Sequence, residues 1–265
     1  MKNIEISVIM AEYNTNIDFL VKSIESILHQ TYKNFELIIV DDCGKNDLEQ
    51  ICARFGDGRI KIIHNTTNKG LAESLNSGIL EAKGKYICRM DTDDISLPDR
   101  LEKQITFAEN NPEYSIIGGN YILFDEKKEY GKSDKYGKVD KESFLVGTPF
   151  AHPTLMINKA DLINSGMYPN YRRAQDYAME MQMYSMGYKG FIMKDVVLKY
   201  RQDSDGYKKK KYKYRVLEYK IRKKYFKMLR VSGFKRFIYQ NKPLVVGLIP
   251  RTILKLYREK KTTKF

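Results

Sequence analysis

Three aspartates within four positions, Asp91, Asp93 and Asp94, directly follow the apolar run Tyr86-Ile-Cys-Arg-Met90. Carboxylates this close together repel one another and raise one another's pKa unless a cation or hydrogen bonds neutralise them. Oxygen ligands without histidine or cysteine suit a hard cation such as Mg²⁺ or Mn²⁺, whose coordination is usually completed by phosphate oxygens of a substrate. The group therefore predicts a divalent cation, Mn²⁺ or Mg²⁺, and a substrate that carries phosphate.

A second acidic pair, Asp41 and Asp42, directly follows another apolar run, Leu37-Ile-Ile-Val40. Ligands of an open parallel sheet bind at the carboxyl ends of its strands, so two acidic groups at strand ends indicate one ligand site. An isolated Asp-x-Asp string is more often a solvated turn. A carboxylate after a strand can also cap the next helix, which fits Asp47. The positions of the two groups favour the ligand site.

The elements that must position these carboxylates can be predicted from the hydrophobic pattern. About the first 95 residues alternate β-rich runs with helix-period segments, which indicates a parallel sheet with helices on both faces. The expected strands cover residues 4–10, 35–40, 60–64 and 85–90, and the expected helices cover residues 17–30, 47–55, 71–82 and 98–110. This pattern predicts the α/β fold class.

Residues 114–201 follow a looser order, which favours a mixed sheet. We expect strands at residues 114–117, 121–124, 154–157 and 196–201, a charged loop at 126–141, and helices near 159–165 and 176–186. Beyond residue 208 the pattern predicts helices that break at Gly233 and Pro243.

The composition is typical of a folded protein. The 265 residues are 42% hydrophobic, which is enough for a substantial core. No stretch reaches the roughly 20 apolar residues that span a bilayer, and the first residues lack a signal-peptide block, so we expect a cytoplasmic chain. Three cysteines without a paired spacing are expected to be reduced and structural.

The net charge of +14 is concentrated at one end, because residues 208–265 hold 21 Lys or Arg against Glu218 and Glu259. Basic amphipathic helices are typical of chains that lie on an anionic membrane surface. Helices that pack on the rest of the chain and keep a solvated basic face are the alternative. Nucleic acid is disfavoured as a partner because no nucleic-acid-binding module accompanies the charge.

Five strings of the chain, taken in order, resemble family 2 glycosyltransferases with the GT-A fold. They are Ser7-Val-Ile-Met-Ala-Glu-Tyr-Asn14, Gln30-Thr-Tyr-Lys-Asn-Phe-Glu-Leu-Ile-Ile-Val-Asp-Asp42, Asn68-Lys-Gly-Leu-Ala-Glu-Ser-Leu-Asn-Ser-Gly78, Asp91-Thr-Asp-Asp94 and Gln175-Asp176. The resemblance covers about residues 4–205. Two further strings, Gly147-Thr-Pro-Phe-Ala-His-Pro-Thr154 and Arg201-Gln-Asp-Ser-Asp205, are similar to bacterial enzymes of exopolysaccharide and capsule assembly.

This resemblance implies a GT-A catalytic domain at residues 1–206, with a mainly parallel, Rossmann-like mixed sheet. A nucleotide-sugar half would cover about residues 1–97 and an acceptor half about residues 98–206. Residues 207–265 would form a basic amphipathic helical tail.

The family's nucleotide-binding positions correspond to Ala11, Tyr13, Asp42, Lys69 and Asp91. The resemblance implies that Ala11 and Tyr13 line a uracil pocket and that Asp42 accepts a hydrogen bond from the uracil ring. Lys69 would lie near the base or the phosphates, and Asp91 would face the ribose or a metal-bound water.

The same resemblance implies that Asp93 and Asp94 hold the metal on the diphosphate and that Asp176 is the general base. An acceptor hydroxyl is a poor nucleophile near neutral pH and needs a carboxylate to take its proton. A single base on the face opposite the leaving group gives inversion. Asp176 could alternatively be the N-cap of the helix that it begins.

Four further residues, Gln175, Arg201, Asp203 and His152, are implied near the acceptor or the diphosphate. Many relatives carry histidine in a Tyr-Arg-x-His string where this chain ends in Asp203, so Asp203 could substitute as an oxygen ligand. His152 has a purely structural alternative, in which its ring donates to a backbone carbonyl.

Together these inferences predict an inverting, metal-dependent transfer of sugar from a nucleotide sugar, UDP-linked, to a lipid-linked saccharide acceptor. The enzyme would be peripheral on the inner face of the cell membrane. A sugar-phosphate nucleotidyltransferase is one alternative, but it needs a glycine-rich loop where this chain has Ala11-Glu-Tyr-Asn14. A catalytically inactive GT-A scaffold is the other, and the intact aspartates disfavour it.

Overall fold

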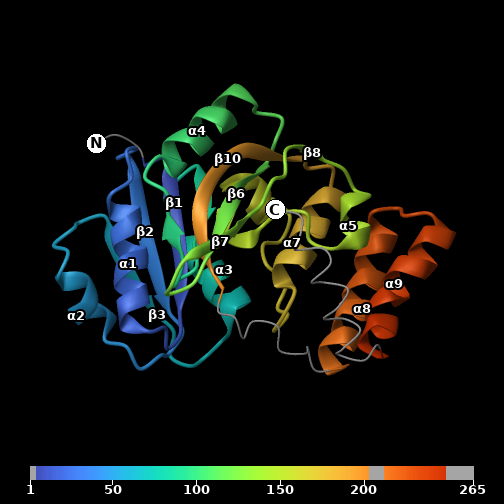
Figure 1. Ribbon diagram of the computed structural model, residues 1–265, viewed down its shortest axis with the longest axis horizontal. Coiled ribbons are helices and arrows are strands. Elements are labelled where there is room, and N and C mark those ends of the chain that lie inside the picture. Colours follow the sequence, from blue (N-terminus) through green and yellow to red (C-terminus); the bar gives the residue numbers. More distant parts are fainter. Residues whose placement is uncertain (1–3, 203–211, 249–265) are drawn as a thin grey trace.

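The computed structural model describes residues 4–202 and 212–248, which form one mixed sheet flanked by helices (Figure 1). The sheet order is β3-β2-β1-β4-β9-β6-β10-β5, with β7 paired to β6 and β8 paired to β10. The strands are β1 (Ile6–Glu12), β2 (Phe35–Asp41), β3 (Ile60–His64), β4 (Tyr86–Arg89), β5 (Ile95–Ser96), β6 (Ile116–Phe124), β7 (Glu129–Lys132), β8 (Gly137–Val139), β9 (Met156–Asn158) and β10 (Gly190–Arg201). The predicted α/β class with a mixed sheet is confirmed.

Helices cover both faces of this sheet. They are α1 (Ile17–Leu28), α2 (Leu48–Ala53), α3 (Leu71–Glu81), α4 (Arg100–Asn110), α5 (Ser143–Val146), the 3-10 turn η1 (His152–Thr154), α6 (Lys159–Asn164), α7 (Gln175–Ser185), α8 (Tyr212–Met228) and α9 (Gly233–Leu248). Side chains alternate along β1, so that Ile6, Val8 and Met10 pack with α1 and α4 while Ile9 packs with α3 and α7. The sheet therefore has a buried core on each face.

The parallel neighbours β3, β2, β1 and β4 bring their carboxyl ends to one edge of the sheet. Both acidic groups singled out in the sequence lie at this edge, after β2 and after β4. Asp47 caps α2 as expected, because its Oδ1 accepts a hydrogen bond from the backbone N–H of Gln50 at 2.9 Å.

The second half of the sheet differs from the prediction. The two strands expected at residues 114–117 and 121–124 are one strand, β6, and Gly119 lies inside it. A Cβ on Gly119 would lie 2.6 Å from a methyl carbon of Val197, so close packing, not a turn, requires glycine there. The loop expected at 126–141 contains β7, most of which is exposed, and β8, whose three residues include one buried apolar side chain, Val139. Such short strands carry little apolar alternation.

Helix α9 runs through Pro243, so the break predicted at that residue is wrong, while the break at Gly233 is confirmed. Proline leaves the carbonyl four residues earlier, that of Tyr239, without its helical N–H donor. Arg222 on α8 supplies a replacement, since its Nη1 donates to Tyr239 O at 3.2 Å. The same Nη1 donates to Leu145 O at 2.8 Å, and Nη2 pairs with Glu218 at 3.1 Å.

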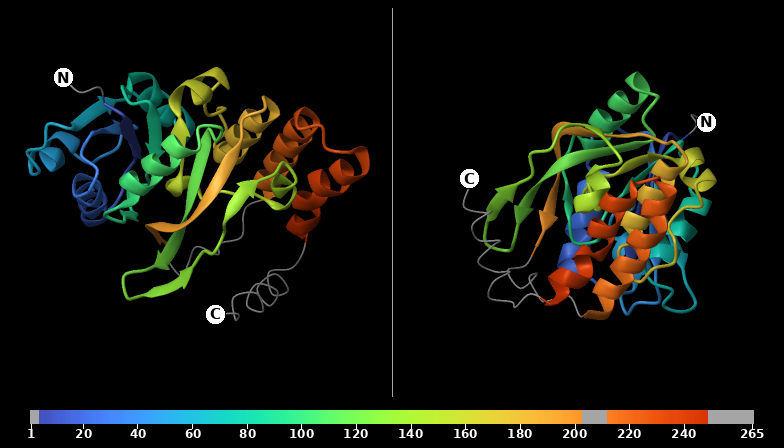
Figure 2. Two further views of the ribbon diagram at one scale, coloured as in Figure 1. Left: turned by 90° about the horizontal axis from the view of Figure 1, so that it is seen from above. Right: turned by 90° about the vertical axis from the view of Figure 1, so that its right-hand side faces the viewer.

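Helix α8 packs into the core that α7 also lines. Ile221, Tyr225 and Phe226 are fully buried there, and the Tyr225 hydroxyl donates to Gln182 Oε1 at 3.0 Å. Figure 2 shows α8 and α9 side by side at the end of the molecule next to α7. Among the helices of the described residues, none has the length and apolar character needed to cross a bilayer.

Candidate active site

Asp42, at the end of β2, holds the loop formed by residues 65–70. Its side chain is buried, and its Oδ1 accepts from Asn65 Nδ2 at 3.0 Å and from the backbone N–H of Lys69 at 2.8 Å. Its Oδ2 accepts from the backbone N–H of Gly70 at 2.8 Å. Because a carboxylate offers about four acceptor positions, one remains for a ligand.

The segment after β1 leaves Tyr13 accessible, with 53% of its surface exposed, and Ala11 half-buried. Glu12, between them, is fully buried, and its Oε1 accepts from the Thr15 backbone N–H and from Asn46 Nδ2, both at 2.8 Å. This acid, for which the sequence offers no account, ties the loop after β1 to the loop after β2.

Asp91, Asp93 and Asp94 come together as predicted, with one oxygen from each lying within 4.8 Å of the others. Asp94 is fully buried, and its Oδ2 has no hydrogen-bond partner among the described residues. Burial, followed by the charge of Asp91, raises the pKa of Asp94 to about 8, and the same two causes raise the pKa of Asp93. An orphaned carboxylate oxygen beside two further carboxylates fits a hard divalent cation.

Two arginines hold this acidic turn in place. Arg89 on β4 is buried and forms an ion pair with Asp91. Arg201 on β10 donates its backbone N–H to Asp94 Oδ1 at 2.7 Å and its Nε–H to Asp93 O at 2.9 Å. Arg89 is the one side-chain cation that pairs with a carboxylate of this turn within the described residues, because the Arg201 guanidinium donates to the Asp93 carbonyl. Three clustered carboxylates with one ion-pair partner suit a cation.

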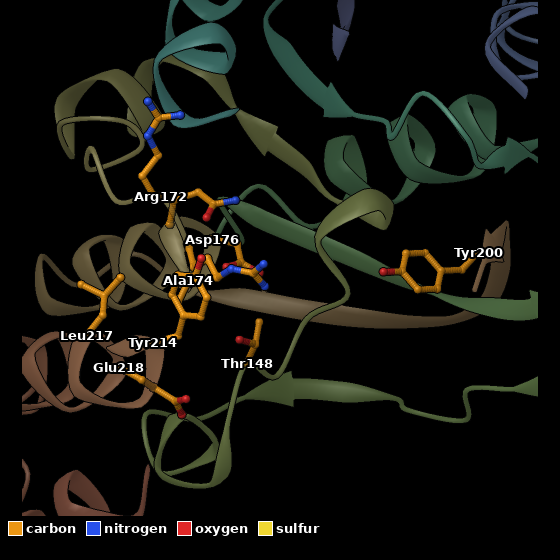
Figure 3. Close-up of a pocket in the computed structure, with 10 residues that line it drawn as sticks. Thr148, Arg172, Ala174, Asp176, Tyr200, Tyr214, Leu217 and Glu218 are labelled. Carbon is orange, nitrogen blue, oxygen red and sulfur yellow. The ribbon is translucent and has the colours of Figure 1, made fainter. Parts of the chain in front are cut away.

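A pocket of about 570 Å³ lies between the start of α7 and helix α8 (Figure 3). Its lining residues are Thr148, Arg172, Arg173, Ala174, Gln175, Asp176, Tyr200, Tyr214, Leu217 and Glu218. Asp176 lies in the first turn of α7, but the N-cap position belongs to Ala174, so the capping role considered for Asp176 is wrong. Ala174 has a left-handed φ of 57°, a conformation uncommon outside glycine that often accompanies functional sites.

Helix α8 completes this pocket with Tyr214, Leu217 and Glu218, which approach Asp176 from the opposite side to Arg172 in Figure 3. The guanidinium of Arg173 stacks 4.3 Å from the ring of Tyr214. Glu218 is compensated by ion pairs within its own helix. Sequence reasoning missed these α8 residues because they come from the segment that it treated as a separate tail.

Of the other predicted residues, Gln175 lines the pocket beside Asp176, whereas His152 is buried away from it. The Nε2 of His152 lies 2.9 Å from the Tyr168 hydroxyl oxygen, so its partner is a side chain and not a backbone carbonyl. Burial, followed by the charge of Arg89, lowers the pKa of His152 well below its usual value. Asp203 lies outside the described residues.

Glu180, one turn after Asp176 on α7, is a further acid that the sequence prediction missed. It is fully buried, and neither carboxylate oxygen has a hydrogen-bond partner within residues 4–202 and 212–248. Burial, followed by the charge of Asp176, raises the pKa of Glu180 well above its usual value, which favours its neutral form. The four-residue spacing from Asp176, on a helix with several Met and Tyr, is the signal that could have found it.

The sequence matches the family model described as Glycosyl transferase family 2 over residues 7–177. The chain belongs to glycosyl transferase family 2. A relative named as a glycosyltransferase, EpsE of Bacillus subtilis (strain 168), is 34% identical over 97% of this chain and 94% of EpsE. The amylovoran biosynthesis glycosyltransferase AmsE of Erwinia amylovora is 32% identical over 75% of this chain and 77% of AmsE.

The fold of this family 2 glycosyltransferase is similar to that of solved structures. S. aureus TarS 1–349 in complex with UDP-GlcNAc superposes with a TM-score of 0.70 at 17% identity, over 92% of this chain and 71% of that one. The GT-A fold and the glycosyltransferase family predicted from the five strings are therefore confirmed. The family match includes Asp42, the acidic turn and Asp176, but it ends before α8.

Proposed function

We propose that this family 2 glycosyltransferase is inverting and metal-dependent, and that it moves a sugar from a UDP-sugar to a lipid-linked saccharide acceptor. The observation that carries the proposal is the connection between the two halves of the site. On β10, Tyr200 lines the pocket of Asp176, and the next residue, Arg201, holds Asp93 and Asp94. A donor bound at the acidic turn would then present its sugar toward Asp176.

A nucleotide-sugar donor is supported by the likeness to TarS, which was solved in complex with UDP-GlcNAc and with UDP. The nucleotide of the donor would contact Ala11, Tyr13, Asp42, Lys69 and Asp91. Asp42 keeps one acceptor position for the base while it fixes the loop that carries Lys69.

Asp93 and Asp94 would hold the divalent cation, Mn²⁺ or Mg²⁺, whose chemistry is to neutralise charge on the departing diphosphate. Arg201 keeps both residues in place through the Asp94 carboxylate and the Asp93 carbonyl. Arg89 orients Asp91 through their ion pair. Asp203 is proposed as an additional oxygen ligand.

Asp176 would act as the general base that takes the proton of the acceptor hydroxyl as that oxygen attacks the anomeric carbon. A single attack on the face opposite the leaving group inverts the configuration. Gln175 beside it is neutral, and burial raises the pKa of Glu180 behind it, so neither side chain competes with Asp176 for the role of base. His152 would act indirectly, by supporting Tyr168.

The acceptor would occupy the pocket between α7 and α8. Arg173 makes no ion pair with any residue that the structure describes, and it stacks on Tyr214, so the pocket offers both a cation and an aromatic face. The biosynthetic relative AmsE supports a role in exopolysaccharide or capsule assembly. A lipid carrier on the acceptor would place the enzyme peripherally at the inner membrane face, with residues 207–265 toward anionic headgroups.

Replacing Asp176 by asparagine tests this function. Asp176→Asn should lower transfer from a UDP-sugar by about 10²–10⁴-fold while leaving the affinity for UDP nearly unchanged, because only the base is removed. Asp140→Asn, a change at an exposed aspartate on the surface, is the matched control. Turnover of Asp176→Asn equal to that of the control would remove Asp176 from the role of base, and a product that keeps the donor's anomeric configuration would exclude inversion.

A further inference from the structure

Helix α9 carries an apolar stripe that is exposed to solvent. Its members are Phe234, Phe237, Ile238, Val245 and Leu248, and their exposed fractions range from 47% for Ile238 to 78% for Phe234. At 3.6 residues per turn, these five positions fall within an arc of roughly 100° on one side of the helix. Such a narrow stripe of large apolar side chains is the face by which a helix normally packs, yet here it is exposed.

The opposite side of α9 is the side that holds the helix on the protein. Pro243 is buried, and Tyr239 packs against the core that α7 and α8 share. Figure 1 places α9 at the edge of the molecule, beyond α8 as seen from α7. The stripe is therefore not needed to attach α9. Asn241 lies within its arc and donates to the Phe237 carbonyl at 2.6 Å, and the large apolar side chains on either side of it are exposed. Exposed apolar side chains grouped in this way mark an interaction site.

The charge around the stripe indicates what covers it. Residues 212–248 contain eleven Lys or Arg and a single acid, Glu218. Lys235 and Lys242 are exposed on α9 about a quarter turn from Phe234, and α8 adds an exposed basic row. A second copy of this chain would bring the same positive charge against itself, whereas an anionic surface would be attracted. Apolar side chains bordered by lysines match the boundary between lipid headgroups and acyl chains.

We infer that the α9 stripe inserts into the acyl boundary of an anionic membrane while the neighbouring lysines bind its headgroups. Within the basic tail, α9 is then the part that contacts the membrane. Only the purpose of this contact, bringing the enzyme to a lipid-linked acceptor, rests on the proposed function. Vesicle binding requires neither donor nor acceptor, so failure of membrane binding and failure of sugar transfer are separate results.

The test measures co-sedimentation of the full chain with vesicles of phosphatidylglycerol and phosphatidylcholine, and with phosphatidylcholine alone. The double variant Phe234→Ser with Phe237→Ser should bind the anionic vesicles roughly 100-fold more weakly, about tenfold for each phenylalanine withdrawn from lipid. The matched control is Leu80→Ser with Met186→Ser, which removes two exposed apolar side chains elsewhere. Affinity for UDP without vesicles should be the same in all three proteins.

A second measurement shows directly which residue meets the lipid. The chain has no tryptophan, so Phe237→Trp introduces a single reporter. Its emission should shift to shorter wavelength with anionic vesicles and be quenched by brominated acyl chains, whereas Leu80→Trp should not respond. The inference is overturned if the serine pair binds vesicles like wild type, or if Phe237→Trp is not quenched. Self-association that Phe234→Ser with Phe237→Ser abolishes, without vesicle binding by wild type, would also overturn it and identify a second copy as the occupant.

Discussion

Arg222 should contribute more to stability than its place in a basic helix suggests, because it donates to two carbonyls and pairs with an acid. In Arg222→Met, a substitution of similar length, Leu145 O and Tyr239 O both lose this donor and Glu218 keeps only the weaker pair with Arg215 at 3.6 Å. Each buried acceptor left unpaired costs about 1–3 kcal/mol, and breaking a largely buried ion pair adds to this. We expect urea denaturation to show a loss of about 3–5 kcal/mol in the free energy of unfolding.

Pro243 provides an internal test of this account. Pro243→Ala supplies the backbone N–H that Tyr239 O lacks. This donor adds little while Arg222 donates to the same carbonyl, but it is needed in a protein without Arg222. The double variant Arg222→Met with Pro243→Ala should therefore recover about 1 kcal/mol more than Pro243→Ala gains alone. A loss below about 1 kcal/mol for Arg222→Met, or strictly additive effects of the two substitutions, would refute the reasoning.

Three further predictions concern packing, buried charge and the acidic turn. Gly119→Ala should destabilise the fold by about 1–3 kcal/mol in thermal or urea unfolding, since its Cβ would clash with Val197, whereas Gly58→Ala, with open space around it, should be neutral. Burial raises the pKa of Glu180 in the folded state, so the wild-type protein loses stability as the pH rises above the pKa of glutamate in the unfolded chain, which is about 4. Glu180→Gln should therefore equal wild type in free energy of unfolding at pH 4 and be the more stable protein at pH 7. The difference should grow by up to about 1.4 kcal/mol per pH unit. An unchanged difference across that range would contradict burial of this carboxyl. Arg201→Ala should weaken Mn²⁺-dependent UDP binding by about tenfold, because the Asp93 carbonyl loses its hydrogen-bond donor and the Phe19 ring loses the guanidinium stacked on it. Arg201→Lys should restore less than half of the lost binding free energy, because lysine has no planar guanidinium.

The first half of the fold could be predicted because β1, β2 and β4 are buried on both faces and appear in the sequence as largely apolar runs. The partly buried edge strand β3 is rich in isoleucine. The second half could not, for local reasons. Strands β7 and β8 are too short to show an alternating pattern, with Val139 as their one buried apolar side chain. The glycines inside β6 suggest a turn where the strand continues. The path of α9 through Pro243 depends on the contact between Arg222 and the Tyr239 carbonyl, which are seventeen positions apart in the sequence, and no local pattern contains that contact.

The site divides in the same way. The acidic turn could be predicted because its carboxylates are neighbours in sequence. The role of Asp176 stays a prediction that comes from a family string. No sequence pattern shows that Asp42 accepts three hydrogen bonds from the loop of residues 65–70. Nor does one show that Tyr214 and Glu218 line the pocket of Asp176. These relations exist only after distant segments pack together.

The most direct test of the central claim is calorimetric titration of the full chain with UDP, first with Mn²⁺ present and then with EDTA. We predict measurable binding with Mn²⁺ that weakens at least about tenfold in EDTA, and the same loss in Asp93→Ala with Mn²⁺ present, because the diphosphate then lacks its counter-charge. Equal affinity for UDP with Mn²⁺ and with EDTA in the wild-type protein would contradict a metal-held diphosphate site at Asp93 and Asp94.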